Sequence, residues 1–150
     1  MKNTTNDKGD VGVAKVMADL TSKGIKIALP SSHHLPFDLI AISPDYELSR
    51  LSIKYCDGEK LQLALRTISA CSKQVIRKVN FDFVDAYAVY SPITGECYYV
   101  PKSELLKNKS LFTLRISEPK NNCNVRRADN YKDVNVIFGC VGERIKPGTC

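Results

Sequence analysis

The chain lacks the patterns of a zinc finger, a secreted disulfide scaffold or a membrane protein. Its six cysteines form no C-x-x-C pair, and its only two histidines, His33 and His34, are adjacent. No apolar run approaches the roughly 20 residues that a membrane span needs, and the polar N-terminus has no apolar signal-peptide core. We therefore expect a cytoplasmic protein whose cysteines are small core residues.

Repeats, low-complexity tracts and a linker between domains are also missing. The 150 residues are 43% hydrophobic and 25% charged, which is enough apolar surface for one core and too little net polarity for disorder. We expect a single domain over 1–150, with a core at about 8–131 and a C-terminal tail at 132–150. The net charge of +6 suits a polyanionic partner, although many proteins carry similar charge for solubility.

The order of the expected elements predicts a mixed α/β sheet covered by helices. Apolar residues recur at helical spacing over 10–23, and Gly24 is placed to end that helix. Strand patterns follow at 25–29, 37–43, 49–56, 61–68, 83–90, 97–100 and 111–117, with a short helix at 102–109. Residues 69–80 show no clear periodicity, and the pattern weakens again after 118.

One charged pair stands out where two expected strands form a hairpin. A five-residue turn at 44–48 would pair Ser43 with Ser49 and therefore place Asp38 opposite Lys54, about 5 Å apart. Side chains alternate along a strand, so Asp38 and Lys54 share one mostly polar face with Ile40 and Ser52. The other face, expected to be the core, carries Phe37, Leu39, Ala41, Leu51, Ile53 and Tyr55. Sequence pairing alone leaves two readings open, a structural ion pair and a functional site.

The residues around this pair resemble a nuclease signature. Pro36-Phe37-Asp38 followed by Ser52-Ile53-Lys54 is similar to the PD-(D/E)xK motif, within the branch of homing endonucleases encoded by bacterial group I introns. The resemblance extends over about 8–131. It also includes Lys8-Gly9-Asp10-Val11-Gly12, Leu29-Pro30, Leu39-Ile40, Val84 to Pro92, Tyr99-Val100-Pro101, Leu114-Arg115, Pro119 to Asn122 and Ala128 to Tyr131. It implies a restriction-endonuclease-like core with a mixed sheet flanked by helices.

The resemblance also implies a chemistry, hydrolysis of DNA with Mg²⁺. Asp38 and the backbone carbonyl of Ile53 would be metal ligands, and Lys54 would orient a water and offset charge on the phosphate. Two positions depart from the family, which usually has Glu where Val13 stands and Asp, Glu or Gln where Ser52 stands. Ser52 could contribute only a neutral oxygen.

Asp10 is a further candidate for the metal site. It lies three residues before Val13, near the same face of the expected helix, and could restore the missing charge. The alternative is that Asp10 is the N-cap of that helix.

Basic residues suggest where DNA would be held. Arg66, Lys73, Arg77 and Lys78 lie in a segment, 66–81, without an acidic residue before Asp82, and form either a phosphate-contacting surface or a solvated face. Arg126 and Arg127 lie beside asparagines and could read bases in the major groove of DNA. The alternative is an ordinary loop that has this composition by chance. Four tyrosines, Tyr87, Tyr90, Tyr98 and Tyr99, are expected as core or half-buried residues of the sheet and not as stacking platforms for bases.

The sequence therefore predicts a sequence-specific, Mg²⁺-dependent endonuclease acting on double-stranded DNA. Because one site cuts one strand, we expect a homo-oligomer, a dimer or a tetramer. The alternatives are a Holliday-junction resolvase, a DNA-binding relative with weakened or lost catalysis because of Val13 and Ser52, and an interaction module that keeps only the fold.

Overall fold

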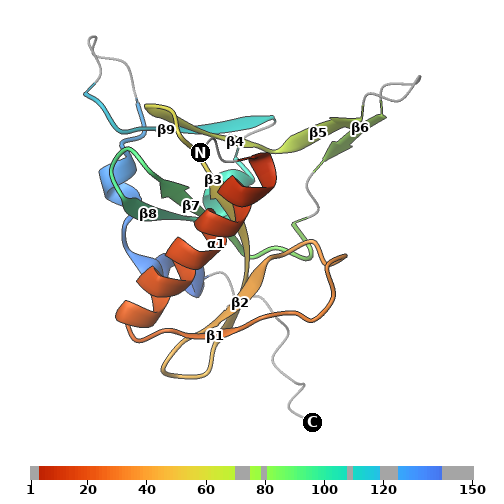
Figure 1. Ribbon diagram of the computed structural model, residues 1–150, viewed down its shortest axis with the longest axis vertical. Coiled ribbons are helices and arrows are strands. Elements are labelled where there is room, and N and C mark those ends of the chain that lie inside the picture. The colour runs from red at the N-terminus through yellow and green to blue at the C-terminus, as the bar shows by residue number, and fades with distance from the viewer. Residues whose placement is uncertain (1–3, 70–74, 79–80, 108–109, 119–124, 140–150) are drawn as a thin grey trace.

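A five-stranded mixed sheet lies at the centre of the molecule, between a long helix and a second, two-stranded sheet (Figure 1). The computed structural model describes residues 4–69, 75–78, 81–107, 110–118 and 125–139. The strand order is β1-β2-β3-β7-β8, with only β3 and β7 parallel. The bounds are β1 Lys26–Ala28, β2 Leu39–Ile42, β3 Leu48–Tyr55, β7 Ala86–Ser91 and β8 Glu96–Pro101. The predicted mixed α/β architecture is confirmed.

The long helix α1 (Thr5–Ser22) begins five residues before the predicted start. The Thr4 side chain accepts a hydrogen bond from the Asp7 N–H, and the Asp7 carboxylate accepts one from the Thr4 N–H, so the two form a capping box. Asp10 is therefore an exposed residue inside the helix, and its alternative role as N-cap was wrong. Gly24, with φ of 79°, follows the helix end as expected.

The first face of the central sheet is the core face that was predicted for the β2–β3 hairpin, and the second face is also buried where it is formed by β7 and β8. Side chains of α1 cover the first face, and β4 (Lys60–Ala64) pairs with β9 (Leu111–Arg115) to cover the second. The first core contains Val16, Leu20, Leu39, Ala41, Leu51, Ile53, Ala86, Ala88 and Tyr99, among others. Phe37 was expected with Leu39, but it precedes β2 and packs against the second core.

The β2–β3 hairpin differs from the predicted one in its turn and hence in its register. Ser43 pairs with Glu47, and the turn contains only three residues, the last of which, Tyr46, has φ of 63°. Leu39 is therefore opposite Leu51, and Asp38, which precedes β2, donates its N–H to the Leu51 carbonyl, so it does not lie opposite Lys54 as predicted. Ser52 and Lys54 share one face of β3, as predicted, because they are two residues apart on the strand.

A two-stranded ribbon extends from the second sheet and projects from the body (Figure 1). It consists of β5 (Arg66–Ser69) and β6 (Val75–Lys78), so the strand predicted at 61–68 is divided at Leu65, and part of the aperiodic segment 69–80 is a strand. The short helix α2 (Lys102–Leu105) lies within the predicted 102–109.

The C-terminal part of the described chain forms two 3-10 helices, η1 (Ala128–Tyr131) and η2 (Val134–Ile137). Val134, Ile137 and Phe138 are buried in the first core, so the packed body continues beyond residue 131. Residues 140–150 of the expected tail lie outside the described residues.

Cys97 is buried and Cys56 half-buried, both as free thiols, and the other four cysteines lie outside the described residues. None of the helices in the described ranges is long and apolar enough to cross a membrane.

Candidate active site

Asp38 lies at the point where the chain enters the sheet. Its N–H donates to the carbonyl of Leu51 (2.8 Å), which extends the β2–β3 pairing by one residue. The next donor along β3, the N–H of Ile53, has no backbone partner on β2 and donates to Oδ2 of Asp38 (2.6 Å). The carboxylate therefore takes the place of a missing strand residue, which fixes the orientation of this exposed side chain.

The carbonyl of Ile53 faces the same place. In a strand, the N–H and the C=O of one residue point to the same side, and the N–H of Ile53 points toward Asp38. The β2–β3 register ends at Leu39 and Leu51, so no residue of β2 is opposite Ile53. A carboxylate and a backbone carbonyl thus lie side by side in a notch at the end of β2.

Two further side chains lie next to this notch. Ser52 precedes Ile53 on β3 and is paired in the parallel register with Tyr87 on β7. Ser52 is only 7% exposed and Tyr87 2% exposed. Burial, and to a lesser extent the nearby charge of Asp38, raises the pKa of Tyr87 to about 12, so the phenol is neutral at physiological pH.

Lys54 follows two residues after Ser52 and is exposed. Its Nζ lies 5.7 Å from the centroid of the Tyr87 ring, within the range of a cation–π contact. Among the ion pairs of the described residues, none joins Asp38 to Lys54. Of the two readings left open by the sequence, the structural ion pair is therefore wrong.

Arg50 and Asp85, which lie two residues before Ser52 and Tyr87, form an ion pair that sequence reasoning missed. The Asp85 carboxylate accepts hydrogen bonds from the backbone N–H, Nε and Nη2 of Arg50, each at 2.9 Å. The Asp85 side chain is 9% exposed and that of Arg50 23%. This bond raises the pKa of the Arg50 guanidinium, and it joins β3 to the start of β7 just before Tyr87.

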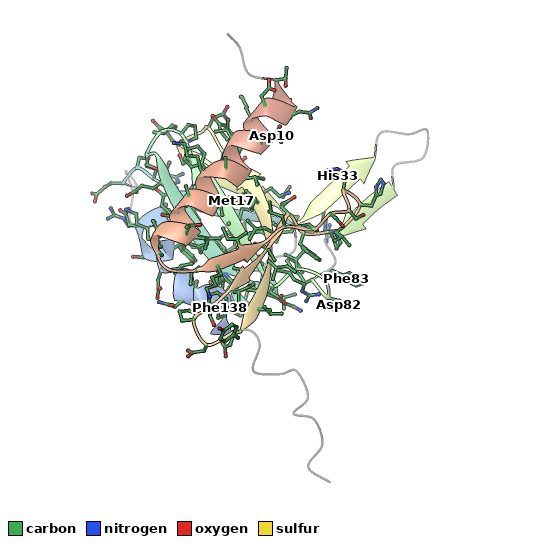
Figure 2. The ribbon with its side chains drawn as sticks, turned by 60° about the horizontal axis from the view of Figure 1, so that its bottom comes forward. Asp10, Met17, His33, Asp82, Phe83 and Phe138 are labelled. Carbon is green, nitrogen blue, oxygen red and sulfur yellow. The ribbon has the colours of Figure 1, made fainter. Side chains whose placement is uncertain are left out.

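Asp10 lies in the N-terminal half of α1, and Met17 two turns further along (Figure 2). Gly12 packs against Tyr55 and Ile53, so α1 crosses β3 close to the notch. The Nζ of Lys15 lies 5.9 Å from the centroid of the Tyr90 ring on β7, so the side of α1 that carries Lys15 faces β7. By helical geometry Asp10 and Val13 share the opposite flank, toward β2.

Comparisons with known proteins identify the family. A model of the PD-(D/E)XK endonuclease family matches residues 3–134. The chain belongs to this endonuclease family. No curated protein sequence matches it.

Two solved structures are similar to the structure of this chain. A bacterial homing endonuclease, I-Ssp6803I, is 17% identical, with a TM-score of 0.72 over 87% of this chain and 89% of that one. This likeness shows the restriction-endonuclease-like fold. The Holliday junction resolvase Hjc from the archaeal hyperthermophile Archaeoglobus fulgidus is 13% identical over 72% of this chain and 84% of that one, with a TM-score of 0.46, which is too low to support a conclusion.

The notch of this endonuclease-family chain offers few metal ligands. Asp38 supplies one carboxylate and Ile53 one carbonyl, whereas Ser52 supplies a neutral hydroxyl. In the described ranges no three His, Cys, Asp or Glu side chains are grouped so that they could hold a metal ion. Mg²⁺ commonly binds proteins through one or two carboxylates plus waters and substrate phosphates. The residues present therefore fit Mg²⁺ at the lower end of that range.

The predicted DNA-binding residues fall into two groups. Arg66 is paired with Lys78, and Thr67 with Arg77, along the β5–β6 ribbon. Lys73 lies outside the described residues. The ribbon therefore carries three of the four residues predicted from the basic segment.

The second predicted group, Arg126 and Arg127, makes contacts within the chain. The Arg126 guanidinium lies 4.7 Å from the centroid of the Phe112 ring. Arg127 forms ion pairs with Glu118 (2.9 Å) and Asp129 (3.7 Å). These contacts hold the segment before η1 against β9.

Proposed function

We propose that this chain is a sequence-specific, Mg²⁺-dependent endonuclease that makes double-strand breaks in DNA, a homing endonuclease of the type encoded by bacterial group I introns. The main support is the notch itself. The Asp38 carboxylate and the Ile53 carbonyl lie together, and the Lys54 ammonium is nearby without being neutralised by Asp38. Family membership supports nuclease chemistry, and the fold of the bacterial homing endonuclease supports the finer assignment.

In this proposal each residue of the notch has one task. Asp38 and the Ile53 carbonyl hold Mg²⁺, with Asp10 on the facing flank of α1 and Ser52 as further oxygen donors, directly or through water. The metal, when bound, withdraws electron density from the phosphate. Lys54 orients the attacking water and offsets the negative charge that grows on the phosphate oxygens as the sugar oxygen leaves.

The β5–β6 ribbon is proposed as the DNA-contacting element. A two-stranded ribbon fits the major groove of B-DNA, and Arg66, Lys73, Arg77 and Lys78 would contact phosphates. His33 lies on the same side of the molecule as the ribbon, in the loop that leads to Asp38 (Figure 2). Base reading by Arg127 would require it to leave Glu118 and Asp129.

The proposed partner chain is a second copy of the protein. One notch per chain cuts one strand, so a double-strand break needs two chains, and a dimer or tetramer would also cover a longer target. Light scattering after size-exclusion chromatography, with and without target DNA, measures this number directly.

Cleavage of a random-sequence plasmid library tests the function. After incubation with Mg²⁺, sequencing of the new ends should reveal one recurrent site, and EDTA should abolish the cut. Insertion of the intron into that site should protect it. Cutting of four-way junctions regardless of sequence would replace the homing assignment with junction resolution, and salt-sensitive binding without cutting would leave a DNA-binding relative.

Two lysine variants connect the activity to the notch. Lys54→Ala should abolish cleavage and leave DNA affinity within about twofold, because one exposed charge among many contributes little to binding. Lys26→Ala is the matched control, since Lys26 is also an exposed strand lysine over a tyrosine ring, at 5.8 Å from Tyr46. Equal activity of the two variants would contradict the assignment of Lys54.

A further inference from the structure

The ammonium of Lys54 is displaced along the sheet, toward Asp38. The backbone of Lys54 is paired with Val89, two residues beyond the pair of Ser52 and Tyr87 and on the same face of the sheet. Yet its Nζ lies over the ring of Tyr87, 5.7 Å from the centroid. The side chain therefore leans back along the strand, toward the level at which the Asp38 carboxylate accepts the hydrogen bond of Ile53.

The ring that receives the ammonium is itself fixed. Tyr87 is 2% exposed and belongs to the second core, and its ring lies against that of Phe81 with centroids 6.4 Å apart. Lys54, in contrast, is exposed on a flexible four-carbon stem. Among the described residues Lys54 forms no ion pair, and the contact found for its ammonium is the ring of Tyr87.

We propose that Tyr87 is a positioning residue for the reaction: its ring holds the ammonium of Lys54 on the side of Asp38, where a phosphate would bind. This inference rests on the proposed nuclease function and names a residue that acts through Lys54. The phenol adds no negative charge that would compete with a phosphate for Lys54, because burial keeps its pKa near 12.

The ring and the hydroxyl can be separated by substitution. Tyr87→Phe keeps the ring and so keeps the cation–π contact, whereas Tyr87→Leu keeps an apolar side chain in the core without a π face. Tyr98→Leu is the matched control, because Tyr98 is 1% exposed in the same core and has no cation over its ring among the described contacts.

The position of Lys54 can be read without any cleavage. A proton above an aromatic ring resonates upfield, so the ε-methylene protons of Lys54 should be shifted upfield in the wild type, in a signal that Lys54→Ala removes. We expect the shift to persist in Tyr87→Phe and Tyr98→Leu and to vanish in Tyr87→Leu. Loss of the shift in Tyr98→Leu, or its retention in Tyr87→Leu, would overturn the proposal.

Cleavage kinetics on the mapped target then test the purpose of the contact. At a temperature where all variants are folded, kcat of Tyr87→Leu should fall about tenfold with KM unchanged, while Tyr87→Phe stays within about twofold of wild type. A fall in Tyr98→Leu as large as in Tyr87→Leu, or an equal fall in Tyr87→Phe, would overturn the positioning role and leave the nuclease function standing. A wild type that binds DNA but never cuts it removes the proposed function and, with it, the catalytic purpose of the contact.

Discussion

Replacing Asp85 by asparagine is expected to lower the free energy of unfolding by about 3 kcal/mol. The substitution keeps the shape of the side chain but removes the charge opposite Arg50 and turns one acceptor into an N–H₂ group that faces Nη2. Breaking a buried ion pair by removing one partner costs about 3–5 kcal/mol. The Arg50 side chain keeps 23% of its surface exposed, so we take the lower end of that range.

Thermal and urea unfolding followed by circular dichroism measure this change. For a domain of this size, about 3 kcal/mol corresponds to a fall in Tm of roughly 6–12 °C. Asp57→Asn is the control, because Asp57 forms an exposed ion pair with Lys8 at 2.6 Å, and we expect no change that the assay resolves.

A double variant tests the physical reason. Arg50→Met combined with Asp85→Leu should recover most of the stability that Asp85→Asn loses, because no uncompensated charge is left inside. If Asp85→Asn is within about 1 kcal/mol of wild type, or no more destabilised than Asp57→Asn, the ion pair does not hold β3 to β7 in the way described.

Three further outcomes are expected. Burial raises the pKa of Tyr87 from 10.0 and of Cys97 from 9.0, both to about 12, so each group stabilises the fold below its ordinary pKa and this contribution is lost as the pH rises from about 9 to 12. Urea midpoints should fall across that range, and less steeply between pH 9 and 10 in Cys97→Ala. Gly12→Ala should raise the free energy of unfolding by about 0.5–1 kcal/mol, since a Cβ there would meet its nearest atom at an ordinary 3.5 Å and the helix gains propensity, and a destabilised variant would contradict that packing. Arg66→Ala with Lys78→Ala should reduce the slope of log affinity for duplex DNA against log salt by about 2, and an unchanged slope would exclude the β5–β6 ribbon from phosphate contact.

The side-chain faces near the candidate site could be predicted from the sequence, but the register could not. Alternation alone placed Ser52 and Lys54 on one face and Leu39, Ala41, Leu51 and Ile53 on the other, because a shift of two residues does not change the face. The shift arises because Tyr46 adopts a left-handed conformation and shortens the turn to three residues. Tyrosine carries no sequence signal for that conformation, in contrast to glycine or asparagine.

Other differences have equally local causes. The capping box of Thr4 and Asp7 was present in the sequence as a Thr-x-x-Asp pattern, but the apolar period that located α1 begins only later, so the helix start was placed five residues too late. The ion pair of Arg50 and Asp85 gave no local signal, because the two residues are 35 positions apart and meet only through the parallel pairing of β3 with β7.

The buried tyrosines connect these differences to the proposed chemistry. The sequence predicted Tyr87 as a core residue, and it is one, but the parallel pairing also places it beside Ser52, where the Lys54 ammonium reaches over its ring. A lysine held by Asp38 would neutralise that carboxylate and reduce its attraction for a cation, and the carboxylate would in turn compete with phosphate for the lysine. An aromatic face attracts the ammonium without a formal charge. The Asp38 carboxylate then remains available to a metal ion and the Lys54 ammonium to a phosphate, which a direct ion pair between them would prevent.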